Sequence, residues 1–66
     1  MEVYVNGKAV SCKDGATLQE ILIRQNFSMD RIAAEVNGEI IPKSGYGAYQ
    51  LHENDHLEVV SFVGGG

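Results

Sequence analysis

Two Asn-Gly pairs, each between short segments of strand-forming residues, constrain the fold of this 66-residue chain more than any other feature. A tight hairpin turn needs positive φ at both of its central residues, and Asn-Gly accepts that conformation at little cost. Asn6-Gly7 and Asn37-Gly38 therefore predict two β-hairpins. Their strands are expected at residues 2–5 and 8–12 around the first turn, and at residues 32–36 and 39–41 around the second.

One amphipathic helix is predicted between the two hairpins. Thr17, with Glu20 three residues later, has the pattern of a capping box, which satisfies backbone N–H groups at a helix start. The apolar residues that follow have the spacing of one helix face: Leu18, Ile21 and Leu22. We expect the helix to extend from Thr17 to about Gln25, with Asn26 as its C-cap.

The most apolar predicted strand is the last, from Leu57 to Val63. The segment at residues 43–50 is expected to form a surface loop or a short helical turn. A strand this apolar belongs in the middle of a sheet, and beside the first strand it is expected to run parallel. The order strand-strand-helix-strand-strand-strand thus predicts an α+β fold, in which one helix packs across a mixed sheet.

Three glycines, Gly64, Gly65 and Gly66, follow this strand directly. We therefore expect one domain over residues 1–63 and a flexible glycine tail over residues 64–66. A glycine tail is compatible with a frayed terminus. It is also suited to a second task, because a backbone without side chains can thread a narrow channel in a partner and bring the Gly66 carboxylate to a buried site.

Composition and charge narrow the possible functions. The formal net charge is −4 and the five basic residues are scattered, which disfavours nucleic-acid binding. No apolar run approaches the roughly 20 residues of a membrane span, and no export signal is evident at the start. A single cysteine fits a reducing compartment. We therefore expect a cytoplasmic protein that binds neither membrane nor nucleic acid.

Two groups of reactive side chains are weak candidates for a site. His52 and His56 have metal-ligand spacing only on a helix, whereas Asn54-Asp55 between them is typical of a turn, so we expect no metal. Cys12 is interpreted as a small residue at a strand end, with a reactive thiol as the alternative. We expect no catalytic arrangement and no bound cofactor, and so do not expect an independent enzyme.

Four segments together resemble those of ubiquitin-like sulfur carriers, and most closely the ThiS family of thiamine biosynthesis. These segments are DGATLQEIL at residues 14–22, VNGEIIP at 36–42, NDHLEV at 54–59 and the terminal Gly65-Gly66. The resemblance covers the whole chain and implies the β-grasp fold, as in ubiquitin. Gly64 is one glycine more than the two that the family requires.

The resemblance also implies a cycle of reactions at Gly66. An adenylating, ThiF-like enzyme would use ATP to activate the Gly66 carboxylate. Sulfur drawn from cysteine by a desulfurase would then convert it to a thiocarboxylate, which a ThiG-like thiazole synthase would consume to build the thiazole ring of thiamine. In this reading the protein is a co-substrate of these enzymes, and Gly64 and Gly65 allow the tail to thread into them.

The alternation of the last strand predicts where partners dock. Period 2 separates residues facing the helix, Leu57, Val59 and Ser61, from residues on the outer face, Glu58, Val60 and Phe62. Exposed Val60 and Phe62 would form a docking patch, unless Phe62 instead covers the end of the sheet. Glu53, Asp55 and Glu58 are expected to add acidic contacts to a basic partner.

Two other functions are compatible with the same sequence. The first is a sulfur carrier for the molybdenum cofactor, which resembles this fold and ending but is usually longer. The second is a ubiquitin-like interaction module without sulfur chemistry, whose tail is inert or is conjugated to lysines.

Overall fold

Five strands and one α-helix form the part of the chain that the computed structural model describes, residues 1–62. In chain order the elements are β1 (Glu2–Val5), β2 (Lys8–Ser11), α1 (Leu18–Arg24), η1 (Met29–Arg31), β3 (Ile32–Val36), β4 (Glu39–Ile41), η2 (Lys43–Gly45) and β5 (His56–Ser61), where η marks a 3-10 turn. This order confirms the sequence of strands and helix that the sequence predicts.

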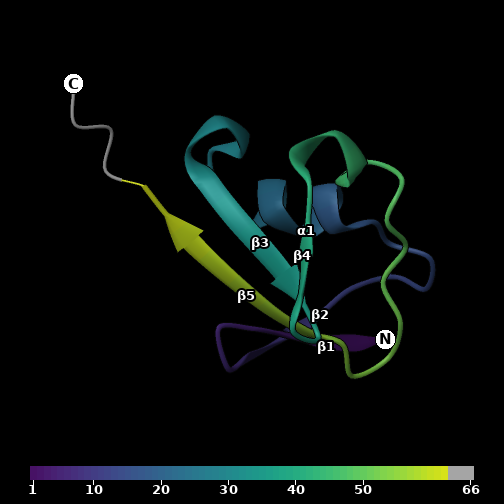
Figure 1. Cartoon of the computed structure of the whole chain (residues 1–66). Coiled ribbons are helices and arrows are strands. Elements are labelled where there is room, and N and C mark those ends of the chain that lie inside the picture. The colour runs from purple at the N-terminus through teal and green to yellow at the C-terminus, as the bar shows by residue number, and fades with distance from the viewer. Residues whose placement is uncertain (63–66) are drawn as a thin grey trace.

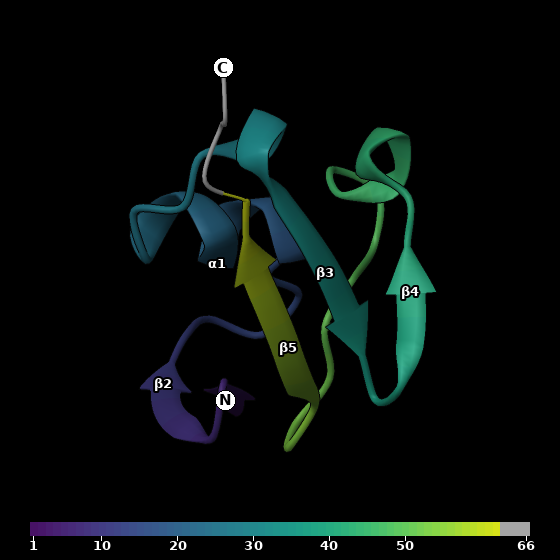
Figure 2. The same cartoon turned by 60° about the vertical axis from the view of Figure 1, so that its left-hand side comes forward.

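The strands form a single mixed sheet in the order β2-β1-β5-β3-β4. The last strand is central, as predicted: β5 runs parallel to β1 and antiparallel to β3. β5 and β3 lie side by side, with α1 behind them (Figures 1 and 2). The predicted α+β architecture is therefore confirmed.

Both hairpin turns have the predicted conformation. Asn6 and Gly7 have φ of 51° and 83°, and Asn37 and Gly38 have φ of 52° and 85°. Positive φ at both central residues is the property of the type I′ turn, whose twist matches that of the flanking strands. The register across the second turn, Val36 opposite Glu39, shows that the turn contains only the Asn-Gly pair.

Local capping explains both ends of α1. The Thr17 hydroxyl accepts a hydrogen bond from the Glu20 backbone N–H at 3.2 Å, whereas the Glu20 carboxylate accepts from the Thr17 hydroxyl rather than from its N–H. At the other end the C-cap is Gln25, one residue before the predicted Asn26. Asn26 follows it with φ of 66°. Its N–H and that of Phe27 donate to Ile23 and Leu22, which is the Schellman pattern. Phe27 then packs against the core.

One face of the sheet packs on α1, and alternation along the strands leaves the other face open. The buried strand residues are Val3, Val5, Val10, Ile32, Ala34, Val36, Ile41, Leu57 and Val59. They form one hydrophobic cluster with the helix residues Leu18, Ile21 and Leu22. The helix thus covers the sheet on one side only.

Several predicted boundaries are wrong by a residue or more. The last strand begins at His56 and ends at Ser61, not Leu57 to Val63; Phe62 follows it, and Val63 lies outside the described residues. Ser61, predicted to face the helix with Leu57 and Val59, is exposed. It pairs with the first residue of β3 at the rim of the sheet, where the core ends.

Two further expectations need correction. The second strand ends at Ser11, before Cys12. The short helical turn expected in residues 43–50 is present as η2, but the segment is not purely a surface loop. Tyr46 is buried in the core cluster because the loop folds back on the start of α1, where the Tyr46 carbonyl accepts from the Gln19 N–H.

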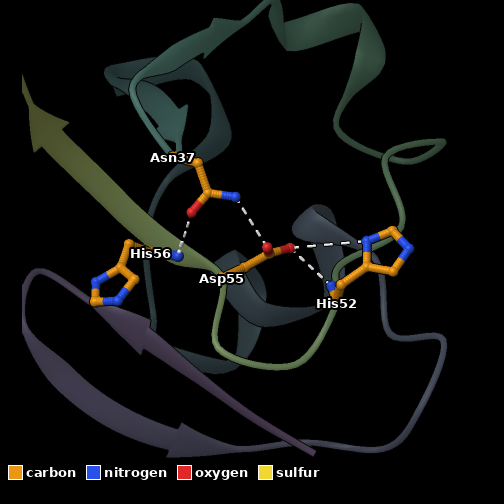
Figure 3. Close-up of polar contacts among 4 residues, drawn as sticks. All are labelled: Asn37, His52, Asp55 and His56. Carbon is orange, nitrogen blue, oxygen red and sulfur yellow. Dashed lines mark hydrogen bonds and ion pairs between the residues drawn. The ribbon is translucent and has the colours of Figure 1, made fainter.

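The two turn asparagines clamp β5 from both sides. The Asn6 amide donates to the Val59 carbonyl and accepts from the Val59 N–H, at 3.1 and 2.8 Å. The Asn37 side chain accepts from the His56 N–H and donates to the Asp55 carboxylate, both at 2.9 Å (Figure 3). Each hairpin turn thereby fixes the position of the central strand through its side chain as well as through its backbone.

We predict that Asn37→Gly destabilises the fold by about 1–3 kcal/mol, because it removes a donor from the buried Asp55 carboxylate and an acceptor from the His56 N–H. Glycine tolerates the positive φ of this position, so the loss reports the side-chain bonds rather than backbone strain. Thermal unfolding should show a decrease of roughly 4–8 °C per kcal/mol for a domain of this size.

Asn26→Gly is the matched control for this prediction. Asn26 also has positive φ, but within residues 1–62 its side chain makes none of the hydrogen bonds found for Asn37. The control variant should melt close to the unmodified protein. Equal melting temperatures for the two variants would contradict the clamp.

Candidate functional site

The end of β5 leads into the glycine tail. Ser61 is still paired with Ile32, and the Phe62 N–H donates to the Arg31 carbonyl at 2.6 Å. The chain is thus held by backbone bonds to β3 and η1 as far as Phe62. Gly64, Gly65 and Gly66, the predicted tail residues, lie outside the described residues.

The outward side chains of β5 lie where the alternation predicts. Leu57 and Val59 are buried, whereas Glu58 is exposed and Val60 is 59% exposed. Phe62, just beyond the strand, is 55% exposed. Half of this aromatic side chain therefore remains available to solvent, which is more than a residue that closes the sheet end would leave.

Neighbouring strands extend this surface beyond the residues that the sequence singles out. In the antiparallel register Ala33 lies opposite Val60, and Glu35 lies opposite Glu58. On the other side of β3, Ile40 lies opposite Glu35 and is 72% exposed. We call these five residues, Ala33, Glu35, Ile40, Glu58 and Val60, the open sheet face.

The sequence analysis missed Ala33, Glu35 and Ile40 as members of this face. Alternation within β3 and β4 was a signal that could have found them. It becomes informative only once the strand order places β3 beside β5 and β4 on the far side of β3.

The two histidines are separated by the turn that precedes β5. His56 stacks on Tyr4 of β1, with ring centroids 4.7 Å apart and an interplanar angle of 15°. His52 instead lies with its Nδ1 4.0 Å from the Asp55 carboxylate (Figure 3). Within residues 1–62 no group of three His, Cys, Asp or Glu side chains is arranged to hold a metal ion.

Cys12 is partly buried and packs against the core, which agrees with its interpretation as a small structural residue. In the described range no helix is long and apolar enough to cross a bilayer. The features that stand out are therefore the open sheet face, Phe62 beside it and the start of the tail.

Comparison with known proteins identifies the family of this chain. Residues 3–66 match the sequence model of the ThiS family. The chain belongs to the ThiS family. It is 40% identical over 65 residues to the sulfur carrier protein ThiS of Bacillus subtilis, covering 97% of this chain and 98% of that protein. The resemblance noted from the sequence segments is thus confirmed.

Two further similarities extend the comparison. A crystal structure of the thiamine biosynthesis protein ThiS from Geobacter metallireducens superposes with a TM-score of 0.82 at 26% identity, and each chain is fully covered. This ThiS-family chain is also 36% identical over its whole length to the thiazole synthase of Magnetococcus marinus, of which it spans only 20%. The predicted β-grasp fold is therefore confirmed, and a ThiS-like segment occurs inside a thiazole synthase.

One predicted acidic contact of this ThiS-family protein is wrong. Asp55 is only 8% exposed, because its carboxylate accepts from the Asn37 amide and from the His52 N–H at 2.7 Å. Its buried carboxylate therefore serves the fold. Glu53 is exposed and accepts from the Glu2 N–H at 3.1 Å, while Glu58 remains on the open sheet face.

An exposed ion pair joins η1 and η2 beside the residue that holds Phe62. Lys43 of η2 pairs with Asp30 of η1, next to the Arg31 carbonyl that holds Phe62. The hydrogen bond from Lys43, together with its positive charge, lowers the pKa of the Asp30 carboxyl. Both groups are well exposed, so this pair contributes little to stability.

We predict opposite sensitivities for the adjacent residues Val59 and Val60, which are 6% and 59% exposed. Val59→Ala should lower the free energy of unfolding by about 1.5–3 kcal/mol, because the methyl groups that it removes are buried. Val60→Ala, the same chemical change on the open face, should alter stability by no more than about 0.5 kcal/mol. Chemical denaturation measures both, and similar losses would contradict the assignment of the two faces.

Proposed function

We propose that this ThiS-family protein is a sulfur carrier of thiamine biosynthesis, and that its sulfur is held as a thiocarboxylate on Gly66. The observation that carries the proposal is the family match, which extends from residue 3 through the whole glycine tail to residue 66. It favours the thiamine pathway over the molybdenum-cofactor pathway. It also disfavours an interaction module with an inert tail.

The chemistry explains why a terminal glycine is needed. A carboxylate is a poor electrophile, so an adenylating, ThiF-like enzyme would first join the Gly66 carboxylate to the α-phosphate of ATP and release pyrophosphate. A persulfide, formed by a cysteine desulfurase, then attacks the carbonyl carbon and AMP leaves. A thiol then attacks the donor's cysteine sulfur in the resulting acyl disulfide, forms a new disulfide with that cysteine and leaves the transferred sulfur on Gly66 as the thiocarboxylate.

The fold would serve this chemistry by holding the base of the tail. The last backbone bond in the described part is from the Phe62 N–H to Arg31. Four residues follow Phe62, and a chain of that length reaches at most about 14 Å. Gly64 and Gly65 carry no side chain that would obstruct a narrow channel, so the carboxylate of Gly66 can enter a buried site.

The same reading assigns partners to the protein. Val60, Phe62 and Glu58 would dock on the adenylating enzyme and on a ThiG-like thiazole synthase, with the desulfurase as the indirect source of sulfur. The ThiS-like segment within a thiazole synthase supports the second partner, because a covalent tether raises the effective concentration of two domains that act together. The protein would then work in the cytoplasm, as a co-substrate and not as an enzyme.

We predict that Gly66 gains sulfur when the protein is incubated with ATP, a persulfide donor, a thiol and a cognate adenylating enzyme. Mass spectrometry of the intact protein should show one oxygen replaced by sulfur, and fragmentation should place the change on the C-terminal peptide. The enzyme is first shown to be active on its own carrier. With such an enzyme, an unchanged mass, or a modification at Cys12, would disprove the proposal.

We also predict that one residue added after Gly66 abolishes adenylation without changing stability. The added residue displaces the carboxylate by about 3.5 Å, and reactions between bound groups do not tolerate a shift of that size. Exposed termini contribute little to stability, so the free energy of unfolding should change by less than about 0.5 kcal/mol.

Pyrophosphate exchange and a thermal melt test this prediction side by side. A residue inserted in the exposed Asn6-Gly7 turn is unsuitable as a control, because Asn6 holds β5. A residue added before Met1 is unsuitable too, because the Met1 ammonium donates to the Cys12 carbonyl. The unmodified protein, assayed in parallel, is the control and should show normal exchange. Normal exchange with the C-terminal extension would show that Gly66 is not the reacting end.

A further inference from the structure

The open sheet face carries two like charges directly opposite each other. Glu35 of β3 and Glu58 of β5 are partners in the antiparallel register. Directly opposite residues have Cβ atoms about 4.5–5.5 Å apart, and like charges in this position destabilise a sheet. Glu35 is partly buried and Glu58 is exposed, so solvent screens the pair only in part.

The described part of the protein does not neutralise this pair. Within residues 1–62 the ion pairs join other groups: the N-terminus with Asp14, Lys13 with Glu20, Lys43 with Asp30 and His52 with Asp55. The nearest titratable neighbour along the outer side of β5 is His56, whose ring is stacked on Tyr4. The acidic pair thus remains uncompensated in the free protein.

Apolar side chains stand on both sides of the acidic pair. Ile40 lies opposite Glu35 on the edge strand β4 and is the most exposed of the large hydrophobic residues in the described part. Val60 follows Glu58 by two residues on β5, and Ala33 lies opposite it. When a partner covers such a surface, water is excluded, and a charge contact within it becomes stronger.

We infer that the open sheet face receives one basic side chain of the adenylating enzyme, an arginine or a lysine, between Glu35 and Glu58. Its aliphatic stem would lie against Ile40 and Val60, as long basic side chains do on apolar surfaces. Its donors would serve both carboxylates, because the planar fork of arginine and the ammonium of lysine each carry several N–H groups. The inference rests on the proposed function and identifies the contact by which that partner is recognised.

A protein side chain fits this surface better than other cations or polymers. Two carboxylates supply only part of the six or more oxygen ligands that a hard metal ion takes, and within residues 1–62 no further His, Cys, Asp or Glu joins them in a group of three. Nucleic acid is excluded by charge, because its phosphates would be repelled. The apolar flanks are also of the kind that mark protein contacts.

This arrangement has opposite consequences for the free protein and for the complex. Neutralising either glutamate removes a repulsion from the free sheet, so its stability should rise. The same change removes a partner for the enzyme's basic side chain, so affinity should fall. A residue that serves only the fold does not combine these two effects.

Glu35→Gln and Glu58→Gln test the inference, with Glu39→Gln as the matched control. Glu39 is exposed and adjacent to Ile40, but it lies opposite the buried Val36, so its side chain belongs to the other side of the sheet. All three variants change the net charge equally. The measurements are melting temperature, affinity for the adenylating enzyme at two salt concentrations, and sulfur loading at saturating enzyme.

We expect Glu35→Gln and Glu58→Gln to melt higher than the unmodified protein, to bind about five- to tenfold more weakly and to show a reduced dependence of affinity on salt. Glu39→Gln should match the unmodified protein throughout. If the two test variants bind like Glu39→Gln, the inference is wrong while the sulfur-carrier function stands. Weaker binding with a lower melting temperature would reveal a folding defect and also overturn it.

Binding and sulfur loading of the unmodified protein distinguish the two proposals. If it binds the enzyme but is never loaded, the proposed function is wrong and the affinities of the variants still decide the docking contact. If it does not bind at all, both proposals are wrong.

Discussion

The hydrogen bonds that hold β5 between β1 and β3 are the constraint on which the other features depend. Within residues 1–62, β5 is the strand that lies between the two hairpins and pairs with both, and without it β1-β2 and β3-β4 would be separate ribbons. Isolated two-stranded hairpins are at best marginally stable in water. Asn6 and Asn37 reinforce this strand through their amides, each from the turn of a different hairpin. The fold therefore depends on contacts between segments that are far apart in the sequence, and a short helix covers the core.

The same strand links stability to the candidate site. Its inward residues Leu57 and Val59 complete the core against α1, while Glu58 and Val60 face outward. Its end is held at Phe62 by η1, which sets where the tail begins. A small domain with a helix on only one side of its sheet leaves the other side free for a partner. In the proposed function, the partner contacts and the base of the tail share one strand, which keeps the distance between them constant.

Much of the fold was predictable because its signals are local. Asn-Gly pairs, the Thr17 cap and the alternation of β5 each depend on a few neighbouring residues, and the structure confirms them, except for the exposed Ser61 at the rim of the sheet. Asp55 shows where this reasoning fails. In the sequence it stands among polar residues and reads as a surface acid, but the second hairpin turn brings the Asn37 amide to its carboxylate from 18 residues away. Burial of that kind has no local signature.

The turn residues, the strand alternation and the helix cap were sufficient for the fold class, and four sequence segments, one of them the glycine ending, were sufficient for the resemblance to sulfur carriers. Which side chains share the open face was decided only by tertiary structure. Glu35 lies on β3, next to β5, and Ile40 lies on β4, one strand further out. No local pattern gives this order, and their placement relative to Glu58 follows from strand order and register. The physical reason is that periodicity within a strand tells which residues share a side, whereas the neighbours on that side come from pairing between distant segments.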